Sequence, residues 1–316
     1  MNVLSLFDGM SCGRIALERA GINVTSYHAS ELDKYAIQVT QANWPDTVQL
    51  GDVTQWREWD IDWKGIDLLI GGSPCQGFSF AGKQLAFDDP RSQLFFVYLD
   101  ILNHIKSLNP DVKFMLENVK MKKEYLDVIS RVLGVEPVFI DSQLVSAQRR
   151  QRFYWANWSI KQPEDTSAKL KDILETGIID RDKAYALTAR YYKAGNFNRY
   201  ATKSSDQIIF ELFGLSETCI AKFNRYGVRF LNHDTKIAKP LTAGDYGKLG
   251  KYGNYLKSLE CETQIRKLTP IECERLQTVE DNYTNHVSNT QRYKMLGNGW
   301  TVDVIAHIFT QGLKNA

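Results

Sequence analysis

The chain has 316 residues, of which 43% are hydrophobic and 24% are charged, and its formal net charge at pH 7 is +2. These proportions are those of an ordinary soluble globular protein, and the small net charge gives no overall sign of a nucleic-acid-binding chain. Any basic surface must therefore be local, and the length allows either one large α/β domain or one domain that carries an inserted second one.

The number and spacing of the cysteines indicate a reducing compartment. There are five, an odd number, and they form neither a Cys-x-x-Cys pair nor a His-rich cluster, so we expect no disulfide framework and no metal site. The opening Met-Asn-Val-Leu-Ser-Leu-Phe has no basic region or cleavage site, and no apolar run approaches the length that spans a bilayer. We therefore expect a cytoplasmic protein without a membrane segment.

The first elements predict the entrance to a nucleotide-type pocket. Residues 3–7 read as a strand, and a glycine-bearing loop leads from them into a helix over residues 15–20. A second strand over residues 24–30 ends in Glu31, 22 residues after Gly9, close to the spacing at which an acidic side chain binds ribose hydroxyls. Alone the pattern is weak, because glycine loops often only turn the chain and a carboxylate after a strand is often solvated or an N-cap.

Two further strand ends carry candidate functional residues. Asp52, in the segment 48–53, is a plausible partner for an adenine amino group. The apolar strand 66–70 is followed by a glycine-rich loop, residues 71–83, that places Cys75 just past the end of a buried strand. Most cysteines are simply buried small hydrophobes, but open α/β sheets place their chemistry at this edge, and a Ser-Pro-Cys-Gln sequence there favours a functional thiol.

Strand and helix patterns continue to alternate through residues 1–158. We expect a helix over 94–105, a strand over 113–116 that leads into Glu117, a helix over 125–133 and a strand over 135–140. This alternation predicts an α/β fold with a doubly wound, mostly parallel sheet.

The character of the chain changes between about residues 159 and 265. This stretch is rich in Tyr, Asn, Lys, Arg and Gly and lacks long helical periods, which indicates a smaller insert of short strands and loops. Interleaved basic and aromatic residues suit contact with phosphates and bases, although a solvated surface or a protein contact fits the composition equally well.

Regular helical patterns resume after the insert. Thr269-Pro270, an N-cap followed by proline, predicts the start of a helix, and the chain ends in an apolar helix over 304–313 that we expect beside the first strand.

Three residue types in the first part can be gathered at one edge of a parallel sheet. Cys75 is a candidate nucleophile, Glu117 a candidate acid, and Arg150 and Arg152 are a pair of fixed cations after a further strand. A thiolate, a carboxylic acid and a guanidinium together suit covalent addition to an electron-poor heterocycle: sulfur attacks, the acid protonates or hydrogen-bonds a ring nitrogen, and arginine binds a carbonyl oxygen.

At this point the chain resembles the carbon-5 cytosine-specific DNA methyltransferases. The matching motifs, in family order, are Phe7-Asp8-Gly9, Glu31, Asp52-Val53, Pro74-Cys75-Gln76, Glu117-Asn118-Val119, Gln148-x-Arg150-x-Arg152, the helix start between Arg266 and Gln277, and Gly297-Asn298. The resemblance implies the S-adenosylmethionine-dependent methyltransferase fold, in which residues 1–158 and 266–316 form the catalytic and cofactor-binding domain. Residues 159–265 would form the target recognition domain.

The resemblance also implies a role for each motif. Cys75 would attack carbon 6 of a cytosine flipped out of duplex DNA, with Glu117 on the ring-nitrogen edge and Arg152, next to Arg150, on the oxygen. Asn118 would brace the cysteine loop. The implied S-adenosylmethionine pocket comprises Phe7, Asp8, Gly9, Gly13, Glu31, Leu32, Asp52, Val53, Pro74, Leu94, Asn298 and Trp300. The expected DNA contacts are Gln76, Ser79 and Lys83 near the cysteine, and Arg190, Lys193 and Arg199 in the insert.

Two departures from the family pattern affect the cofactor contacts. Many members have paired glycines where this chain has Ser11-Cys12, and Ser-Val where it has Gly299-Trp300. Gly13 and Trp300 are more similar to the vertebrate de novo DNA methyltransferases. Because no regulatory module precedes Val3, we expect a minimal prokaryotic or phage enzyme, with a cognate restriction endonuclease as a functional rather than a physical partner.

Two other functions fit parts of the pattern. A tRNA cytosine methyltransferase of the same superfamily would use the same cysteine chemistry, but its relatives usually carry a Cys-Phe-Thr tripeptide that this chain lacks. A non-catalytic DNA-binding relative need not keep the nucleophile, the acid and the arginine together, and this chain has all three. The sequence therefore favours a DNA cytosine methyltransferase, and it leaves the recognised DNA site open because base readout depends on which side chains reach the groove edges.

Overall fold

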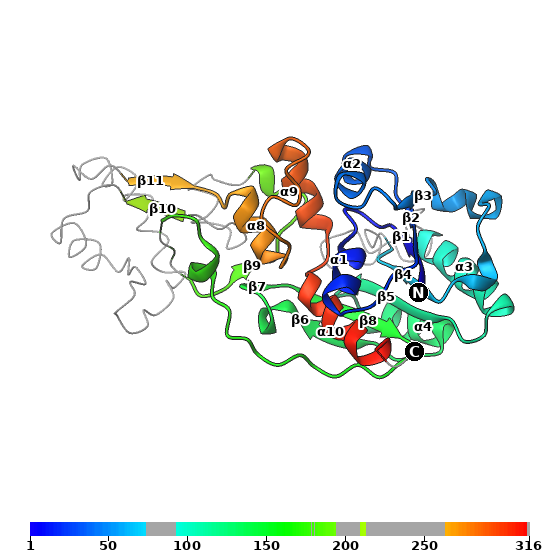
Figure 1. Cartoon of the computed structure of the whole chain (residues 1–316). Coiled ribbons are helices and arrows are strands. Elements are labelled where there is room, and N and C mark those ends of the chain that lie inside the picture. The colour runs from blue at the N-terminus through cyan, green and yellow to red at the C-terminus, as the bar shows by residue number, and fades with distance from the viewer. Residues whose placement is uncertain (74–92, 178, 180, 194–208, 213–262, 315–316) are drawn as a thin grey trace.

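A computed structural model of the chain describes residues 1–73, 93–177, 179, 181–193, 209–212 and 263–314. The expectations for Pro74, Cys75, Gln76, Ser79, Lys83 and Arg199 lie outside the described residues. The predicted α/β class is confirmed: a central sheet lies between two layers of helices (Figure 1).

The central sheet has seven strands in the order β3-β2-β1-β4-β5-β8-β6. Its strands are β1 (Asn2–Leu6), β2 (Ser26–Ser30), β3 (Val48–Gln49), β4 (Leu68–Gly71), β5 (Lys113–Val119), β6 (Val138–Asp141) and β8 (Gln151–Ala156). β1 to β5 pair in parallel, whereas β8 runs antiparallel to both β5 and β6. The sheet order reverses after β3, so β4 and the later strands of this sheet lie on the other side of β1.

Side chains alternate between the two faces along each central strand, as the pleat requires. In β1, Val3 packs into one hydrophobic cluster while Leu4 packs into the other, and Leu68 and Leu69 of β4 divide in the same way. Apolar side chains thus pack on both faces of these central strands, which explains why β4 reads as a continuous hydrophobic run rather than as an alternating one.

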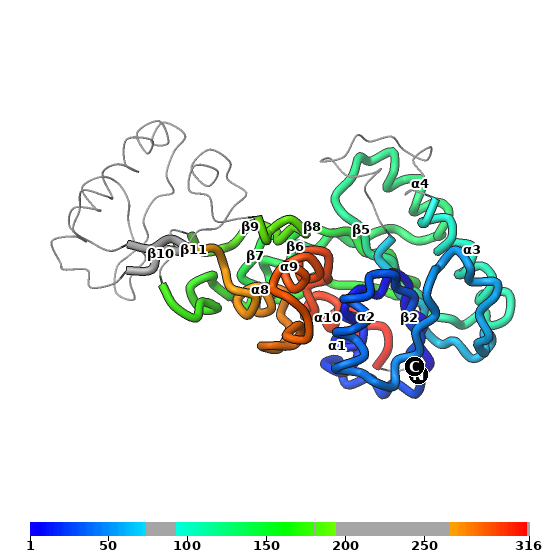
Figure 2. The backbone as a smooth tube through the Cα atoms, turned by 90° about the horizontal axis from the view of Figure 1, so that it is seen from above, coloured from blue at the N-terminus to red at the C-terminus, as the bar shows by residue number. Residues whose placement is uncertain are grey.

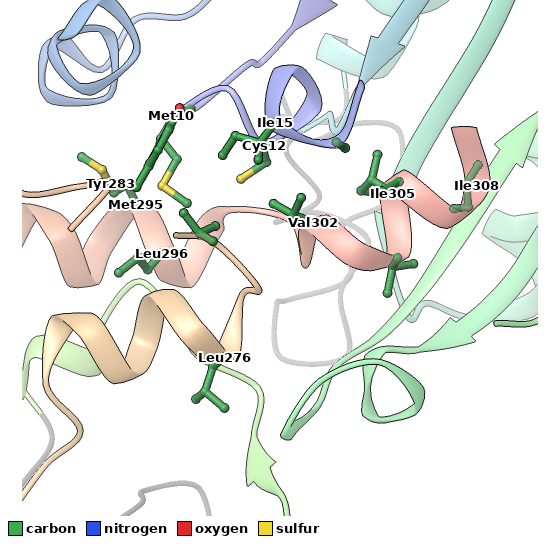
Figure 3. Packing of buried hydrophobic residues seen from close by; sticks show 14 of the residues in the cluster. Met10, Cys12, Ile15, Leu276, Tyr283, Met295, Leu296, Val302, Ile305 and Ile308 are labelled. Carbon is green, nitrogen blue, oxygen red and sulfur yellow. Dashed lines mark hydrogen bonds between the residues drawn. The ribbon is translucent and has the colours of Figure 1, made fainter. Parts of the chain in front are cut away.

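Different helices cover the two faces. One face carries α1 (Cys12–Arg19), α2 (Lys34–Asn43) and α10 (Val302–Gly312), and the other carries η1 (Val53–Glu58), α3 (Gln93–Leu108) and α4 (Lys123–Leu133). The terminal helix α10 returns to the first face and lies beside α1 (Figures 1 and 2). Figure 3 shows Cys12 and Ile15 of α1 near Val302 and Ile305, so the two ends of the chain share one core.

Two more helices extend the first face toward the predicted insert. α8 (Pro270–Leu276) begins as the sequence predicts: Glu272 N donates to Thr269 Oγ1 at 3.1 Å, Thr269 N donates to Glu272 Oε2 at 2.7 Å, and Pro270 occupies the first turn. α9 (Asn289–Asn298) packs against α8, and Leu276 and Leu296 point into the shared core (Figure 3).

The described part of residues 159–265 is attached to this core by short elements. β7 (Gln148–Arg149) pairs in parallel with β9 (Ala184–Tyr185), and η5 (Leu170–Ile173) and η6 (Tyr191–Lys193) bury Leu170 and Tyr191 in the cluster that holds α8 and α9. β10 (Ile209–Leu212) and β11 (Thr263–Arg266) form an antiparallel pair beyond α8 (Figures 1 and 2). The domain limits at 158 and 265 stay predictions.

No helix in the part of the chain that the structure describes is long and apolar enough to cross a membrane.

Candidate active site

The register of β5 and β8 brings Glu117 and Arg152 together. Tyr154 lies opposite Glu117, so Arg152, two residues from Tyr154, points to the same face one step along the strand. Arg152 Nε lies 2.8 Å from Glu117 Oε1, and the two side chains are only 16% and 11% exposed. The contact is an ion pair rather than a hydrogen bond, because the Nε–H is not directed at the oxygen. The predicted acid and cation are therefore neighbours at the carboxyl edge of the sheet.

The second carboxylate oxygen of Glu117 has a different partner. Trp300, which lies between α9 and α10, donates its indole Nε1–H to Glu117 Oε2 at 3.1 Å. Trp300 is predicted from the sequence to line the cofactor pocket. Its contact with Glu117 is not predictable from local patterns, because 183 residues separate the two positions.

Asn118 reaches toward the segment that precedes the cysteine. Its amide Nδ2 donates to Ser73 Oγ at 3.4 Å, and its Oδ1 accepts the N–H of Val119 at 2.8 Å. Asn118 is buried, and Ser73 is the last residue that the structure describes before Pro74. The contact agrees with the expectation that Asn118 braces this loop, while its link to Cys75 itself stays a prediction.

Arg150 lies deeper than Arg152 and binds backbone rather than Glu117. Its guanidinium donates to the carbonyl oxygens of Leu187 at 3.1 Å, Gly297 at 3.3 Å and Gly299 at 2.8 Å. Burial, and then the neighbouring Arg152 cation, lower the pKa of Arg150 to about 9, so the group still carries its charge at neutral pH. A direct contact of Arg150 with a base stays a prediction; the contacts seen join three chain segments.

Sequence reasoning missed a buried amide network behind Arg150. Gln148 Nε2 donates to Gln277 Oε1 at 2.9 Å and to Leu276 O at 2.8 Å. Gln277 Nε2 donates to Leu296 O at 2.6 Å, and Thr301 Oγ1 donates to Gln277 Oε1 at 2.9 Å. Gln148 and Gln277 belong to recognised motifs, but nothing local indicates that they are partners, since 129 residues separate them, and nothing local marks Thr301. The network fixes the C-terminal segment against the arginine segment.

Glu31 contacts the first glycine loop directly, while its predicted contact with a ribose stays a prediction. Gly9 N donates to Glu31 Oε2 at 2.8 Å, and the N–H groups of Leu32 and Asp33 donate to Oε1 at 2.7 and 2.8 Å. Phe7 and Gly9 both have positive φ, 58° and 61°, so the chain turns sharply here. Glu31 thus holds the loop and its own strand end in a fixed geometry.

Asp8 lies in this loop, between Phe7 and Gly9, and its carboxyl group accepts hydrogen bonds from three hydroxyl groups. Ser5 donates to its Oδ1 at 2.6 Å, Tyr27 donates to the same oxygen at 2.8 Å, and Ser11 donates to Oδ2. Burial raises the pKa of Asp8 to about 6, because the loss of water costs the carboxylate more than the three donors return. Asp8 therefore titrates close to neutrality.

The other predicted cofactor residues that the structure describes differ in burial and in the elements that carry them. Asp52 accepts from Thr54 N and Oγ1 at 2.9 and 2.8 Å through Oδ1 and caps η1, in which Val53 is buried. Leu32 is 69% exposed, Gly13 is buried, and Leu94 is half-buried in the first turn of α3. Asn298, at the end of α9, is exposed.

Basic residues occur at two exposed places near the site. Arg190 and Lys193 of the predicted insert are exposed. Lys120, Lys122 and Lys123, which the sequence analysis did not single out, are also exposed and follow directly after β5. Only one ion pair within this lysine group is described, between Lys122 Nζ and Glu124 Oε1 at 3.6 Å.

No group of three or more His, Cys, Asp or Glu side chains that could hold a metal ion occurs among the described residues.

Several known proteins are similar to this chain in sequence or in fold. The family profile described as C-5 cytosine-specific DNA methylase matches residues 1–130 and 140–314. The type II methyltransferase M.HhaI of Haemophilus parahaemolyticus is 30% identical over 98% of this chain and 93% of its own length. M1.ScrFI of Lactococcus lactis subsp. cremoris is 29% identical over 96% of this chain and 75% of its own. The fold is similar to the crystal structure of S. pombe Dnmt2 methyltransferase, with a TM-score of 0.66, 17% identity, and coverage of 100% and 99% of the two chains.

Proposed function

The chain belongs to the C-5 cytosine-specific DNA methylase family, and we propose that it methylates carbon 5 of a cytosine within a short site of double-stranded DNA, with S-adenosylmethionine as methyl donor. The observation that carries the proposal is the pair formed by Glu117 and Arg152, whose heteroatoms lie 2.8 Å apart at the edge where the chain enters the Cys75 loop. A carboxyl group and a guanidinium side by side match the ring nitrogen and the carbonyl oxygen on one edge of cytosine.

The target base must first leave the double helix. Carbon 5 of a stacked, paired cytosine is neither nucleophilic enough to accept a methyl group nor accessible to a protein pocket, and extrusion costs a few kcal/mol, about as much as several groove or phosphate contacts return. Once the base is extruded, its Watson–Crick edge is free to meet Glu117 and Arg152.

The residues of this chain then activate the base. The Cys75 thiolate adds to carbon 6, and the displaced electron pair moves toward the ring nitrogen, where Glu117 supplies a proton or a hydrogen bond. Arg152 stabilises the charge on the oxygen. Carbon 5 becomes enamine-like and forms the new bond to the methyl group. Loss of the carbon-5 proton to a base then re-forms the double bond between carbons 5 and 6 and expels the Cys75 thiolate, and any proton that Glu117 gave to the ring nitrogen returns to it.

The end of the sheet that holds Glu31 fits the proposed methyl donor. S-adenosylmethionine would supply an electrophilic methyl group on a sulfonium. Glu31 uses its two oxygens for three backbone N–H donors and keeps acceptor capacity for a ribose hydroxyl. The neighbouring Leu32 is an exposed apolar side chain suited to an adenine ring, and space is open beside Gly9, where an added Cβ would have no neighbour within 4 Å.

The exposed cations support a polyanionic substrate. Lys120, Lys122 and Lys123 lie at the carboxyl edge of the sheet, next to Glu117, and we expect them to contact phosphates together with Arg190 and Lys193 of the insert. Lys122→Ala should lower the slope of log affinity against log salt by about 0.9. Lys64→Ala, an exposed lysine in η2 (Trp63–Gly65) at the opposite edge, before β4, is the matched control and should leave the slope unchanged.

A mechanism-based DNA substrate tests the proposed function. A fluorine at carbon 5 cannot leave as a cation, so incubation with S-adenosylmethionine and duplex DNA that contains 5-fluorocytosine at the methylated site should give a protein–DNA complex that survives denaturing gels. Cys75→Ser should form no complex, whereas Cys219→Ser, a change at a thiol without an assigned role, should form it normally.

Three results would contradict the proposal. The first is a wild-type protein that methylates ordinary DNA without trapping on the fluorinated DNA. The second is full activity of Cys75→Ser. The third is methylation and trapping of tRNA with no reaction on duplex DNA, which would move the activity to the RNA-modifying branch of the superfamily.

A further inference from the structure

Trp300 occupies the space between the cofactor loop and Glu117. On one side its indole ring lies against Gly13: a Cβ added at Gly13 would lie 3.5 Å from Trp300 Cζ3. On the other side its Nε1–H donates to Glu117 Oε2 at 3.1 Å. We propose that Trp300 is a positioning residue that fixes the carboxyl group of Glu117 for its contact with the ring nitrogen of the base. This inference rests on the proposed function and goes beyond it, because it assigns Trp300 an effect on the reaction rather than only a place in the pocket wall.

Glu117 is held through both of its oxygens. Oε1 lies 2.8 Å from the Arg152 cation on β8, and Oε2 accepts the indole N–H from the C-terminal segment. Rotation of the carboxyl plane would break both contacts at once. Since each carboxylate oxygen can accept two hydrogen bonds, each keeps one position for the base or for a proton. Trp300 therefore restrains the acid without using up its capacity to react.

A glycine makes this close arrangement possible. A Cβ at Gly72, just past the end of β4, would lie 2.9 Å from Glu117 Oε2 and 3.0 Å from Trp300 Nε1. The first distance is shorter than real Cβ contacts and the second is at their lower limit, so any side chain at position 72 would displace Glu117 or Trp300. Gly72 is thus required where three segments, β4, β5 and the residues before α10, approach one another.

The backbone on both sides of Trp300 is anchored by buried side chains. Arg150 donates to Gly299 O at 2.8 Å, and Thr301 Oγ1 donates to Gln277 Oε1 at 2.9 Å. These contacts give Arg150 an indirect part in the site: it holds the segment that carries Trp300, which in turn holds Glu117. A side chain fixed at its own backbone can position another group accurately.

The effect of the N–H must be separated from the effect of the ring. Trp300→3-benzothienylalanine, introduced by genetic code expansion, replaces N–H by sulfur and keeps the size and shape of the bicyclic ring. A hydrogen bond to a charged group contributes about 1.5–3 kcal/mol, so we expect kcat to fall about 10- to 100-fold. The dissociation constant for S-adenosylmethionine, measured by calorimetry, and the KM for DNA should change less than about twofold, because the ring is retained.

A double-mutant cycle tests whether the N–H acts through the carboxylate. In a Glu117→Ala background, single-turnover methylation rates of the Trp300 and benzothienylalanine proteins should be equal, since there is no carboxyl group left to position. Trp300→Phe and Gly72→Ala, checked for folding by their unfolding temperatures, should show the same signature as the benzothienylalanine protein: lowered kcat with nearly unchanged cofactor affinity.

Several outcomes would overturn the positioning role. Unchanged kcat without the N–H would do so, as would an equal loss of rate in the presence and absence of Glu117. A protein that loses only cofactor affinity, and recovers full kcat at saturating S-adenosylmethionine, would show that Trp300 is a pocket wall. The wild-type protein tests the proposed function separately. If it does not methylate carbon 5 of DNA, both proposals fail. If it does, and removal of the indole N–H leaves kcat unchanged, only the positioning role of Trp300 fails.

Discussion

The two ends of the candidate site are built in different ways. The proposed cofactor end is local: Gly9 and Glu31, joined at 2.8 Å, are 22 residues apart and belong to one βαβ unit. The catalytic end is assembled from distant segments, since Trp300 reaches Glu117 across 183 residues and Arg152 comes from an antiparallel strand. A change at the cofactor end should therefore act on binding, and a change at the catalytic end on the rate of reaction.

The largest expected effect is at Glu117. Glu117→Ala should lower kcat by about 10²- to 10⁴-fold, the range for removal of a general acid or base, because the ring nitrogen loses its partner. Affinity for S-adenosylmethionine should be unchanged in calorimetric titrations. Glu136→Ala, an exposed carboxylate just before β6, is the control and should keep full activity. A comparable fall in cofactor affinity for Glu117→Ala would mean that the two ends are not separable.

Asp8 should make the stability of the cofactor end depend on pH. Burial raises its pKa in the folded chain from 3.8 to about 6. The folded state therefore binds this proton more tightly than the unfolded state. The contribution of protonated Asp8 to the unfolding free energy is fully present below pH 3.8 and is lost as pH rises through about 6. The shift corresponds to about 3 kcal/mol of unfolding free energy.

Asp8→Asn should remove this loss of stability, because the amide does not ionise. Its oxygen can still accept from Ser5 and Tyr27, and its NH2 group can donate to Ser11, whose hydroxyl then accepts. Urea unfolding of the wild-type and Asp8→Asn proteins from pH 4 to pH 7 measures this loss of unfolding free energy. The difference in unfolding free energy between Asp8→Asn and wild type should grow in favour of Asp8→Asn across this range. A difference that is constant with pH would refute the raised pKa.

Arg150→Lys tests the connection between the arginine segment and the C-terminal segment. Lysine keeps the charge but cannot donate to the carbonyls of Leu187, Gly297 and Gly299 together, so buried acceptors lose partners at a cost of about 2 kcal/mol in unfolding free energy. We also expect a lower kcat, since Trp300 follows Gly299. Arg149→Lys, at an exposed position, is the matched control and should leave the unfolding free energy and kcat unchanged. A stable, fully active Arg150→Lys would show that Trp300 needs no such support.

The smallest effect is expected from Glu31→Ala. Loss of the ribose partner should weaken S-adenosylmethionine binding about 10-fold, which corresponds to about 1.4 kcal/mol, while kcat at saturating cofactor stays nearly unchanged. The unfolding temperature should also fall slightly, because Gly9 N loses an acceptor that the structure shows. Unchanged affinity in a folded Glu31→Ala protein would contradict the assignment of this end to the cofactor.

Local patterns in the sequence are enough to predict the fold class, the alternating order of strands and helices in residues 1–158, and the start of α8 at Thr269 and Pro270. They also indicate that Gly9 and Glu31 belong to one pocket and that Glu117 and Arg152 belong to one site. These features depend on short-range rules: apolar strands have a recognisable length, caps have preferred residues, and the carboxyl ends of parallel strands share one edge.

Packing between distant segments fixes how the two arginines divide their contacts and what Trp300 contacts. Arg150 and Arg152 are two residues apart and chemically identical, yet one binds carbonyls of the C-terminal segment and the other pairs with Glu117. That difference depends on where α9 and α10 return to the sheet, which no local pattern encodes. Trp300 is the same kind of case: the identity of its partner follows from the register of β5 and from the space left by Gly72, both of which are set by packing between distant segments.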